Sequence, residues 1–490
     1  MVLFTYTERR DKMKAATRRA FAFIMCLVLT FTASATAFAA DTQATENWTQ
    51  YWKEYTDEGR AIMVQPGSDE SERYISWYSA AGAGEGYVLI SGSEDMASPV
   101  KFSGTFTETN QGDIRNNIVV SGLEKGETYY YQCCNGNEKS SAAEINTVSG
   151  NDFSALYVTD IHISYDETNE NSVSEQAFKW NSVLAAANER EDISLVLSAG
   201  DQGSAGLRSE YEGLVASPYA RNMSIATTVG NHDIKYTDYK AFHFVPNEST
   251  NGTIHNFISA DYWFTKGNTL FMVLDSNCQS IPDHRAFMAS AVKANPDAKW
   301  RIMMFHHDLY GGRIEHRESE CKLMRLLYTP LADEFSVDLV LLGHSHYYTI
   351  SNVMYGNKTV TETAGLSSVE NAAGTIYMVS GSINRPRTLD ESETPPLGEN
   401  AGHSYLTDEM IYNILDFTED SITVKSYTLE SGECFNTFTL FKTSAQGGHD
   451  KTSTPFYEPA VRILSKIYAF FDKIVRCFKF FNKFYLGIDD

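Results

Sequence analysis

The sequence predicts an α/β domain that follows a small all-β domain, and three observations carry this expectation. Between residues 152 and 442, apolar strand-like runs alternate with helical patterns, which is typical of an α/β fold. Between residues 71 and 148, short alternating strands are separated by Gly, Ser and Asn turns, which is typical of a β-sandwich. Asp, Asn and His residues directly follow several of the α/β strands, where ligands collect in such folds.

Composition places bounds on the function. The chain has 490 residues, 42% hydrophobic and 13% aromatic, so packed cores in more than one domain are expected. The formal net charge of −23 argues against a nucleic-acid-binding surface, because phosphate backbones require Lys and Arg patches. A phosphorylated substrate remains compatible with this charge, since bound cations can reverse the local field.

Residues 1–39 predict a secretory signal peptide. A basic segment precedes an apolar run at residues 20–31, and small residues follow it up to Ala39, as in cleavable signals. The run is too short to span a bilayer comfortably, although an uncleaved anchor is the alternative. We therefore expect a secreted or extracytoplasmic protein.

The all-β domain is expected at residues 71–149, after a polar lead-in segment at residues 40–70. Its strand-like runs share period-two alternation and lie at residues 74–78, 87–90, 117–120 and 128–131. Aromatic side chains are abundant there. We expect them to form the core of the sandwich, with a carbohydrate-binding face as the alternative.

The α/β domain is expected at residues 150–442. Its strand-like runs lie at residues 155–158, 195–197, 225–229, 270–274, 302–305 and 339–342. Helical patterns lie near residues 174–190, 285–294 and 323–335. Three further strands, near residues 412–417, 422–429 and 435–441, are expected to close the domain.

A Ser-, Thr- and Gly-rich linker is predicted at residues 443–459, followed by a basic amphipathic helix at residues 460–490. Its Phe-rich apolar faces and its Lys and Arg residues are typical of helices that lie in a membrane interface. Peripheral association with a membrane or the cell envelope is one interpretation. Packing on the protein's own acidic surface is the other.

Five polar motifs follow strand-like runs and together indicate a two-metal site. They are Asp160-Ile161-His162, Gly200-Asp201, Gly230-Asn231-His232-Asp233, His306 and Gly343-His344-Ser345-His346. Two cations about 3.5–4 Å apart need a bridging carboxylate and two sets of hard or borderline ligands. Taken alone, each motif could be a polar turn, but the full set favours metal binding.

The ligands divide into two groups around Asp201, which suits the bridge. Asp160, His162 and His346 are expected to hold one metal, and Asn231, His306 and His344 the other. Because an Asn oxygen is neutral, it limits the negative charge at a site that accepts a phosphate.

This ordered set resembles the calcineurin-like metallophosphoesterase superfamily, over roughly residues 153–442. The segment 374–381 is similar to the family's late core strand. Residues 122–131 resemble the tyrosine-bearing turn of fibronectin type III-like domains, in particular the N-terminal sandwich of purple acid phosphatases. The resemblance implies an α/β (α+β) four-layer metallophosphoesterase sandwich preceded by a small all-β fibronectin type III-like sandwich.

The resemblance also implies a function, the hydrolysis of phosphate mono- or diesters by a binuclear metal centre of Fe, Mn or Zn. A metal-bridging hydroxide would attack phosphorus in line. His232 would act as general acid or transition-state stabiliser. His307 and Arg313 are weaker candidates for substrate contacts, and Arg385 and Arg387 are further ones, with a structural or solvated surface role as the alternative for each.

Two departures from purple acid phosphatases matter. Ser204 stands where those enzymes have the Tyr that gives their colour, and His162 stands where they have Gly. We therefore expect a colourless enzyme. The role of Asp233 stays open.

A non-catalytic protein is the alternative function. It would bind glycans or membranes at the cell surface through the β-sandwich and the basic tail. The complete ligand set argues against this interpretation, because loss of catalysis usually leaves gaps at metal positions.

Overall fold

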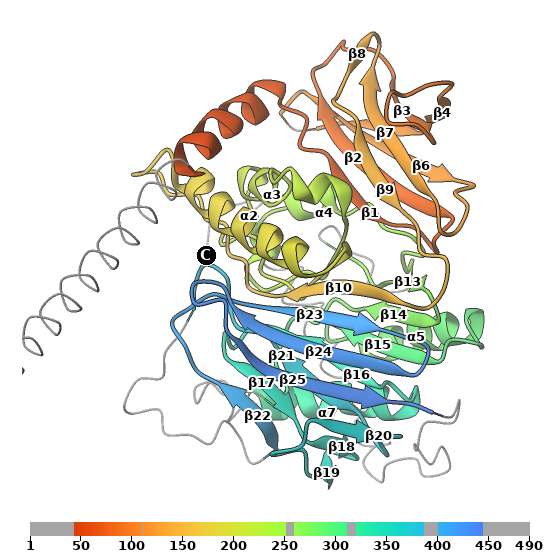
Figure 1. Ribbon diagram of the computed structural model, residues 1–490, viewed down its shortest axis with the longest axis vertical. Coiled ribbons are helices and arrows are strands. Elements are labelled where there is room, and N and C mark those ends of the chain that lie inside the picture. Colours follow the sequence, from red (N-terminus) through yellow and green to blue (C-terminus); the bar gives the residue numbers. More distant parts are fainter. Residues whose placement is uncertain (1–43, 110, 251–258, 311–319, 387–399, 444–490) are drawn as a thin grey trace, which may run out of the picture. The chain divides into compact units, whose positions relative to one another are not determined.

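The computed structural model describes residues 44–109, 111–250, 259–310, 320–386 and 400–443 (Figure 1). The predicted signal peptide, the C-terminal helix and Arg313 lie outside these residues. The chain divides into two compact units, Met1–Glu58 and Gly59–Asp490. In the first unit, the described part is a helix at residues 44–58. Of the described helices, none combines the length and apolarity that crossing a membrane requires.

The second unit begins with two antiparallel sheets that form the predicted β-sandwich. One sheet has the strand order β1 (Met63–Pro66), β2 (Glu72–Ser79), β6 (Ile114–Ser121), β5 (Thr105–Glu108). The other contains β4 (Val100–Ser103), β3 (Gly86–Ser91), β7 (Thr128–Asn135), β8 (Glu138–Lys139) and β9 (Ala143–Asn146). Strand β1 lies inside the expected lead-in segment, so the sandwich starts before residue 71. Four residues are too few for a clear alternation in the sequence.

The sandwich core explains the aromatic content of this domain. Trp77 and Tyr131 are fully buried with Val88 and Ile118 in one apolar cluster, which confirms the core interpretation for these aromatics. The indole Nε1 of Trp77 donates to Asn135 Oδ1 at 2.7 Å, because a buried polar group needs a partner. Tyr129 Oη accepts a hydrogen bond from the Glu124 backbone N at 2.9 Å, so the predicted tyrosine-bearing turn is present.

Two seven-stranded mixed sheets form the α/β part of the second unit. The first has the order β12 (Ser224–Thr227), β11 (Ile193–Ser198), β10 (Phe153–Val158), β23 (Ile411–Phe417), β24 (Ser421–Thr428), β25 (Cys434–Phe441), β20 (Ser368–Glu370). The second has the order β13 (Tyr262–Lys266), β14 (Thr269–Val273), β15 (Trp300–Met304), β16 (Leu339–Leu342), β21 (Ile376–Val379), β17 (Tyr348–Ser351), β22 (Ala401–Tyr405). Their facing sides share one buried apolar core.

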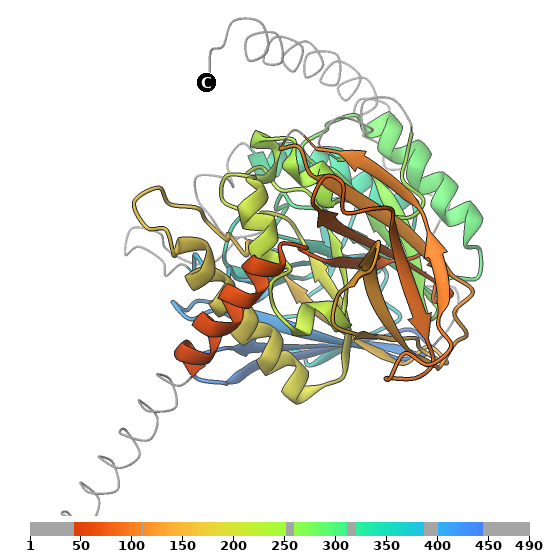
Figure 2. The same cartoon turned by 90° about the horizontal axis from the view of Figure 1, so that it is seen from above.

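Helices cover the outer faces of the two sheets. α5 (Ile281–Ala294) and α7 (Glu320–Glu334) share a second apolar core with the second sheet. α2 (Ser172–Arg190) lies against the first sheet, and α2 and α5 stand on opposite sides of the paired sheets (Figure 1, Figure 2). The resulting order of helices, sheet, sheet and helices confirms the expected α/β sandwich. The three predicted helical patterns correspond to α2, α5 and α7.

Parallel pairing brings the polar motifs together. β10, β11 and β12 run parallel in the first sheet, and β14, β15, β16 and β21 do so in the second. The carboxyl ends of parallel strands meet at one edge, so the segments that follow them converge. Strands β13, β17 and β22 were not among the expected ones, and they pair antiparallel at or near the sheet edge.

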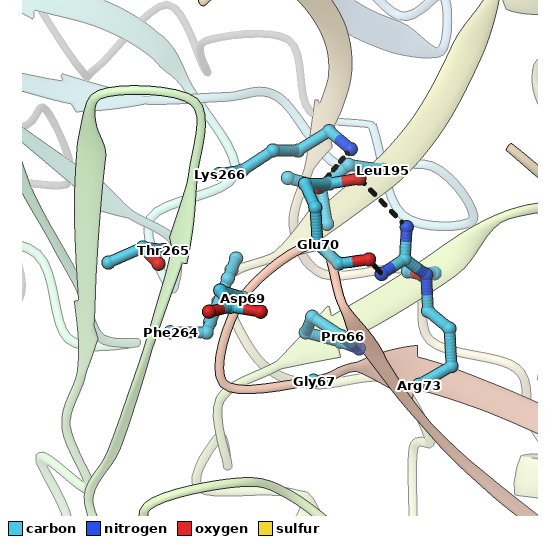
Figure 3. A pocket seen from close by; sticks show the side chains of 10 residues that line it. Pro66, Gly67, Asp69, Glu70, Arg73, Leu195, Phe264, Thr265 and Lys266 are labelled. Atoms are coloured by element: carbon cyan, nitrogen blue, oxygen red, sulfur yellow. Dashed lines mark hydrogen bonds and ion pairs between the residues drawn. The ribbon is translucent and has the colours of Figure 1, made fainter. Parts of the chain in front are cut away.

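A buried ionic cluster joins the β-sandwich to the second sheet (Figure 3). Glu70 Oε1 accepts from Lys266 Nζ at 2.7 Å, and Glu70 Oε2 accepts from Arg73 Nη2 at 3.0 Å. The Val148 backbone N also donates to Glu70 at 3.0 Å. Burial alone would raise the pKa of Glu70, but the charges of Lys266 and Arg73 outweigh it and hold this pKa below its ordinary value. The carboxylate is therefore ionised, and it is the counter-ion that two buried cations share.

Glu70→Gln is expected to lower the free energy of unfolding by about 3 kcal/mol at pH 7, because two buried cations lose their counter-ion. Since the folded-state pKa of Glu70 lies below its ordinary value of about 4.5, this stabilisation is complete above that pH. It disappears as the pH falls through the folded-state pKa. Urea titrations between pH 3 and 7 measure the difference. Glu108→Gln, at an exposed position of β5, is the control, and equal effects of the two substitutions would contradict the account.

Candidate metal centre

Seven predicted ligands follow five strands of the two sheets. Asp160 and His162 follow β10, and Asp201 follows β11. Asn231 follows β12, His306 follows β15, and His344 and His346 follow β16. The structure brings all of them together at the carboxyl edge of the parallel strands. Asp160, Asp201 and His306 are buried, so their side chains are held by the surrounding protein.

The first group of ligand atoms comprises Asp160 Oδ1, His162 Nε2 and His346 Nε2. His346 Nε2 lies 3.2 Å from Asp160 Oδ1 and 3.2 Å from His162 Nε2. His162 Nε2 lies 3.7 Å from Asp160 Oδ1 and 3.7 Å from Asp201 Oδ2. Asp160 Oδ1, His162 Nε2 and His346 Nε2 therefore lie close enough together to share one metal ion, and Asp201 Oδ2 adjoins this group next to His162.

The second group comprises Asn231 Oδ1, His306 Nε2 and His344 Nδ1. Asn231 Oδ1 lies 3.0 Å from His306 Nε2 and 2.9 Å from His344 Nδ1. His306 Nε2 lies 3.3 Å from Asp201 Oδ2. Asp201 Oδ2 thus faces both groups, as a bridging ligand must.

The residues fit a pair of metal ions. Nitrogen and oxygen ligands bound at about 2.1 Å to one ion lie roughly 3–3.5 Å apart, which matches most of these separations. Asp160 Oδ1 is buried and has no hydrogen-bond partner within the described part of the chain. Two overlapping sets, Asp160 with His162 and His346, and Asp160 with Asp201 and His306, each place their ligand atoms within 4.8 Å of one another.

Burial and the neighbouring charges determine the protonation of these groups. Burial lowers the pKa of His162 to about 3, so its ring is neutral and a nitrogen lone pair is available to a metal. Burial opposes protonation of His306, but the charges of Asp201 and Asp160 raise its pKa to about 10. Without metal, His306 therefore carries a proton that a bound cation would displace.

The backbone at the ligands is strained. φ is +50° at Asp160, +52° at His162, +51° at Asp201, +74° at His344 and +63° at His346, a left-handed region that non-glycine residues seldom occupy. Each such residue costs roughly 1–3 kcal/mol, and such strain clusters at functional sites. Hydrogen bonds hold the conformation: Asp160 N donates to Gly200 O at 3.0 Å, and His162 N donates to Asp201 O at 2.9 Å.

Each carboxylate is held by its second oxygen. Asp160 Oδ2 accepts from His344 N at 2.8 Å and from Thr159 Oγ1 at 2.8 Å. Asp201 Oδ1 accepts from His232 N at 2.8 Å. A Cβ at Gly230 would lie 2.1 Å from Asp201 Oδ1, so this glycine permits the close approach of two loops, and φ at Gly230 is not positive.

Asp233 has a structural role that its position in the sequence did not indicate. Its side chain is fully buried and accepts from Gly230 N at 2.9 Å, Gly203 N at 3.2 Å and Tyr211 Oη at 3.0 Å. Burial and the charge of Asp201 raise the pKa of Asp233 to about 7. Asp233 therefore ties the loop after β11 to the loop after β12 and positions the ligands Asp201 and Asn231.

His232 lies at the edge of the metal centre, and its ring stacks edge-on against His162 with centroids 4.9 Å apart. Its Nδ1 donates to Ser204 O at 2.6 Å, which fixes the ring. No described residue forms a hydrogen bond with His232 Nε2, so this nitrogen is the one available to a substrate.

His307 is buried beside the ligands. Its Nδ1 lies 2.8 Å from Ser276 Oγ, and burial lowers the pKa of His307 well below its ordinary value. With 8% of its surface exposed, this geometry favours the structural alternative over a substrate contact. Arg313, the other weak candidate, lies outside the described residues.

The sequence interpretation missed the groups that orient the ligand histidines. His306 Nδ1 donates to Ala199 O at 2.9 Å, and His346 Nδ1 donates to Arg385 O at 3.0 Å. His344 Nε2 lies 3.3 Å from Glu320 Oε2, at the start of α7. Such partners fix the tautomer of a ligand histidine and raise its basicity. Glu320 carries no sequence signal, because an acidic residue in the first helical turn is ordinary.

Glu320→Gln is expected to weaken binding of the metal at the Asn231, His306 and His344 group by about tenfold, because the ligand His344 loses its carboxylate partner. Calorimetric titration of metal-free protein with Mn²⁺ or Zn²⁺ measures this. Glu334→Gln, at the other end of α7, serves as the control. Unchanged affinity in Glu320→Gln would show that the carboxylate does not orient His344.

Comparisons with known proteins agree with this geometry. Residues 153–348 match the family model for calcineurin-like phosphoesterases, and residues 60–147 match the model for the purple acid phosphatase N-terminal domain. The chain therefore contains a calcineurin-like phosphoesterase domain preceded by a purple acid phosphatase N-terminal domain.

The chain is also similar to two plant proteins. It is 26% identical to purple acid phosphatase 1 of Ipomoea batatas over 185 residues, 34% of this chain and 38% of that protein. It is 23% identical to purple acid phosphatase 22 of Arabidopsis thaliana over 257 residues, 50% of this chain and 55% of that protein. The matched region thus spans about two fifths to about half of the length of these relatives.

Solved structures show the same fold. A purple acid phosphatase from yellow lupin (Lupinus luteus) seeds aligns with a TM-score of 0.61 at 16% identity, covering 78% of this chain and 74% of that one. PhoD aligns with a TM-score of 0.53 at 12% identity, covering 84% of this chain and 98% of that one. At these identities the likeness concerns the fold.

Proposed function

We propose that this protein is a binuclear metal-dependent phosphoesterase that hydrolyses phosphate mono- or diesters. The observation that carries the proposal is the convergence of two ligand groups on one carboxylate oxygen, Asp201 Oδ2. The two family matches support it, since they cover the sandwich and the ligand-bearing segments up to residue 348.

Asp160, His162, Asp201 and His346 would hold one metal, and Asp201, Asn231, His306 and His344 would hold the other. Iron, manganese and zinc all suit such a set of nitrogen and oxygen ligands. When bound, the two cations would activate water for in-line attack on phosphorus and neutralise charge on the phosphate oxygens.

The chain's own residues position the substrate and move the proton. His232 is anchored through Nδ1 on Ser204 O, so its Nε2 is the atom that delivers a proton to the leaving oxygen or stabilises the charged transition state. Asn231 supplies a neutral ligand oxygen, which keeps negative charge away from the incoming phosphate. Asp233 holds the loop that carries both residues.

The non-catalytic alternative has less support. The sandwich aromatics Trp77, Tyr78 and Tyr131 are buried in or against the core and offer no stacking surface to a glycan, whereas Phe106 of β5 is 62% exposed. The basic tail on which this alternative also depends lies outside the described residues. The seven candidate ligands, in contrast, lie together at one edge of the parallel strands, which supports the phosphoesterase proposal.

Hydrolysis of p-nitrophenyl phosphate and bis-p-nitrophenyl phosphate in the presence of Mn²⁺ tests the proposal. Wild-type protein should turn over at least one of them, and the ratio of rates separates monoesterase from diesterase. His232→Gln should lower kcat by about 10²–10⁴-fold with unchanged metal content, because a proton donor is lost and the ligands stay intact. Absence of turnover across a broad phosphoester panel, despite two bound metals, would refute the proposal.

The proposal includes a secreted or extracytoplasmic location, motivated by residues 1–39, and envelope association through residues 460–490. Fractionation of bacterial cells expressing the full chain, or the chain lacking residues 460–490, tests both points. The full chain should leave the cytoplasm and pellet with the envelope, and the shortened chain should move to the soluble extracytoplasmic fraction. Retention of both in the cytoplasm would contradict the location.

A further inference from the structure

Two cationic side chains meet at Ser204, beside the metal centre. Lys235 Nζ donates to Ser204 O at 3.1 Å, and Arg385 Nη2 donates to Ser204 Oγ at 3.0 Å. Ser204 O also accepts from His232 Nδ1 at 2.6 Å, and Ser204 Oγ lies 3.4 Å from His162 Nδ1. One residue thus links both cations to the proposed proton donor and to a proposed metal ligand.

Both side chains are exposed, while the backbone of Arg385 is held by the centre itself. Arg385 O accepts from His346 Nδ1 at 3.0 Å, and Arg385 N donates to Ser382 Oγ at 3.0 Å. Lys235 ends the short 3₁₀ helix η2 (Asp233–Lys235), whose first residue is the buried Asp233. Within the described part of the chain, the two charged groups are therefore exposed beside the centre, and the backbone of each is held in place.

The charge of the guanidinium is available to a ligand. Within the described part of the chain, the Arg385 side chain makes a single hydrogen bond, to the neutral Ser204 hydroxyl, and no ion pair with a carboxylate. The chain carries 63 acidic residues against 40 basic ones, so an excess of basic residues does not explain the arginine at this position. The Arg385 guanidinium and the Lys235 ammonium both donate to Ser204, so an anion bound beside this serine would meet two positive charges.

The position of the two cations relative to His232 indicates which part of a substrate would carry the anion that they bind. His232 is the proposed donor to the leaving oxygen, and it shares Ser204 with both cations. Three contacts link Arg385 to Asp160. The guanidinium donates to Ser204 Oγ, Ser204 Oγ lies 3.4 Å from His162 Nδ1, and His162 Nε2 lies 3.7 Å from Asp160 Oδ1. A group bound at the cations would therefore lie beside His232 and the candidate ligand His162, on the side from which the leaving oxygen would take its proton.

We propose that Arg385 and Lys235 form a subsite for a second oxyanion, so that the preferred substrates are phosphoesters whose leaving group carries a carboxylate or a further phosphate. The inference rests on the proposed function for the identity of the neighbouring site. Arginine forks recognise carboxylate and phosphate with paired, charge-assisted hydrogen bonds, and the lysine adds a compact charge.

Binding of two phosphonates to the metal-loaded full chain tests the subsite without requiring turnover. 3-Phosphonopropionate and propylphosphonate share the phosphonate that would face the metals, and only the former carries a carboxylate. Calorimetry should show that wild-type protein binds 3-phosphonopropionate about tenfold more tightly, the contribution of a charge-assisted hydrogen bond. The Arg385→Gln/Lys235→Gln double variant should bind both compounds to within about twofold.

Matched variants separate the subsite from general charge effects. Arg385→Lys keeps the charge and should retain part of the preference. Arg285→Gln removes an arginine that pairs with Glu334 on the outer helices, and it should retain all of it. Equal binding of the two compounds by wild type, or a preference that survives in the double variant, would overturn the inference.

The outcome is distinct from that of the activity assay. Turnover of p-nitrophenyl phosphate without any preference between the phosphonates refutes the subsite alone. A preference that depends on Arg385 and Lys235, in a protein that hydrolyses no phosphoester, refutes the phosphoesterase proposal alone.

Discussion

The sharing of Asp201 between two ligand groups is the constraint on which the site depends. Its Oδ2 must reach His162 and His306 at once, and these residues come from different sheets. The carboxylate can do this because His232 N fixes its other oxygen and because Gly230 has no Cβ to displace it. The left-handed backbone at Asp160, Asp201 and the two histidines of the Gly343–His346 segment is the conformational cost of this convergence, which the hydrogen bonds between the loops and the packed sheets beneath them offset.

The β-sandwich contributes to the support of this edge. Arg208, at the start of α3 (Arg208–Leu214), donates to Asp113 of the sandwich at 2.6 Å. Two residues further along, Glu210 accepts from Ala205 N at 2.9 Å, next to Ser204. The loop that carries Ser204 is thus held between the sandwich and the metal ligands. Together with the Glu70 cluster, this ties the N-terminal domain to the geometry of the site, so the sandwich has a structural reason to precede the α/β domain.

Much of the fold and the convergence of the candidate ligands could be predicted, because each candidate ligand closely follows an apolar run. Asp160, Asp201 and His306 stand two or three residues after a buried parallel strand, and periodicity together with residue type is sufficient there. The β-sandwich was equally visible from its alternating strands and from the turn that Tyr129 closes. Each of these predictions rests on residues that are close together in the sequence.

The contacts missed by the sequence interpretation join segments far apart in the chain. Glu320 orients His344 across 24 positions, and Arg385 reaches Ser204 across 181. No local pattern distinguishes these residues from ordinary surface charges. Asp233 was uncertain for a related reason, since its partners Gly203 and Tyr211 become neighbours only when β11 and β12 pair. The substitution of Ser204 for tyrosine was visible, but its meeting with two cations was not.

The metal content of the Asp201→Ala variant, compared with wild type, tests the shared carboxylate most directly. After metal loading and removal of unbound ions, elemental analysis of wild-type protein should find about two metal ions per chain. Asp201→Ala should retain about one or fewer, because both groups lose a ligand. Two ions retained by the variant, or at most one bound by wild type, would contradict the account.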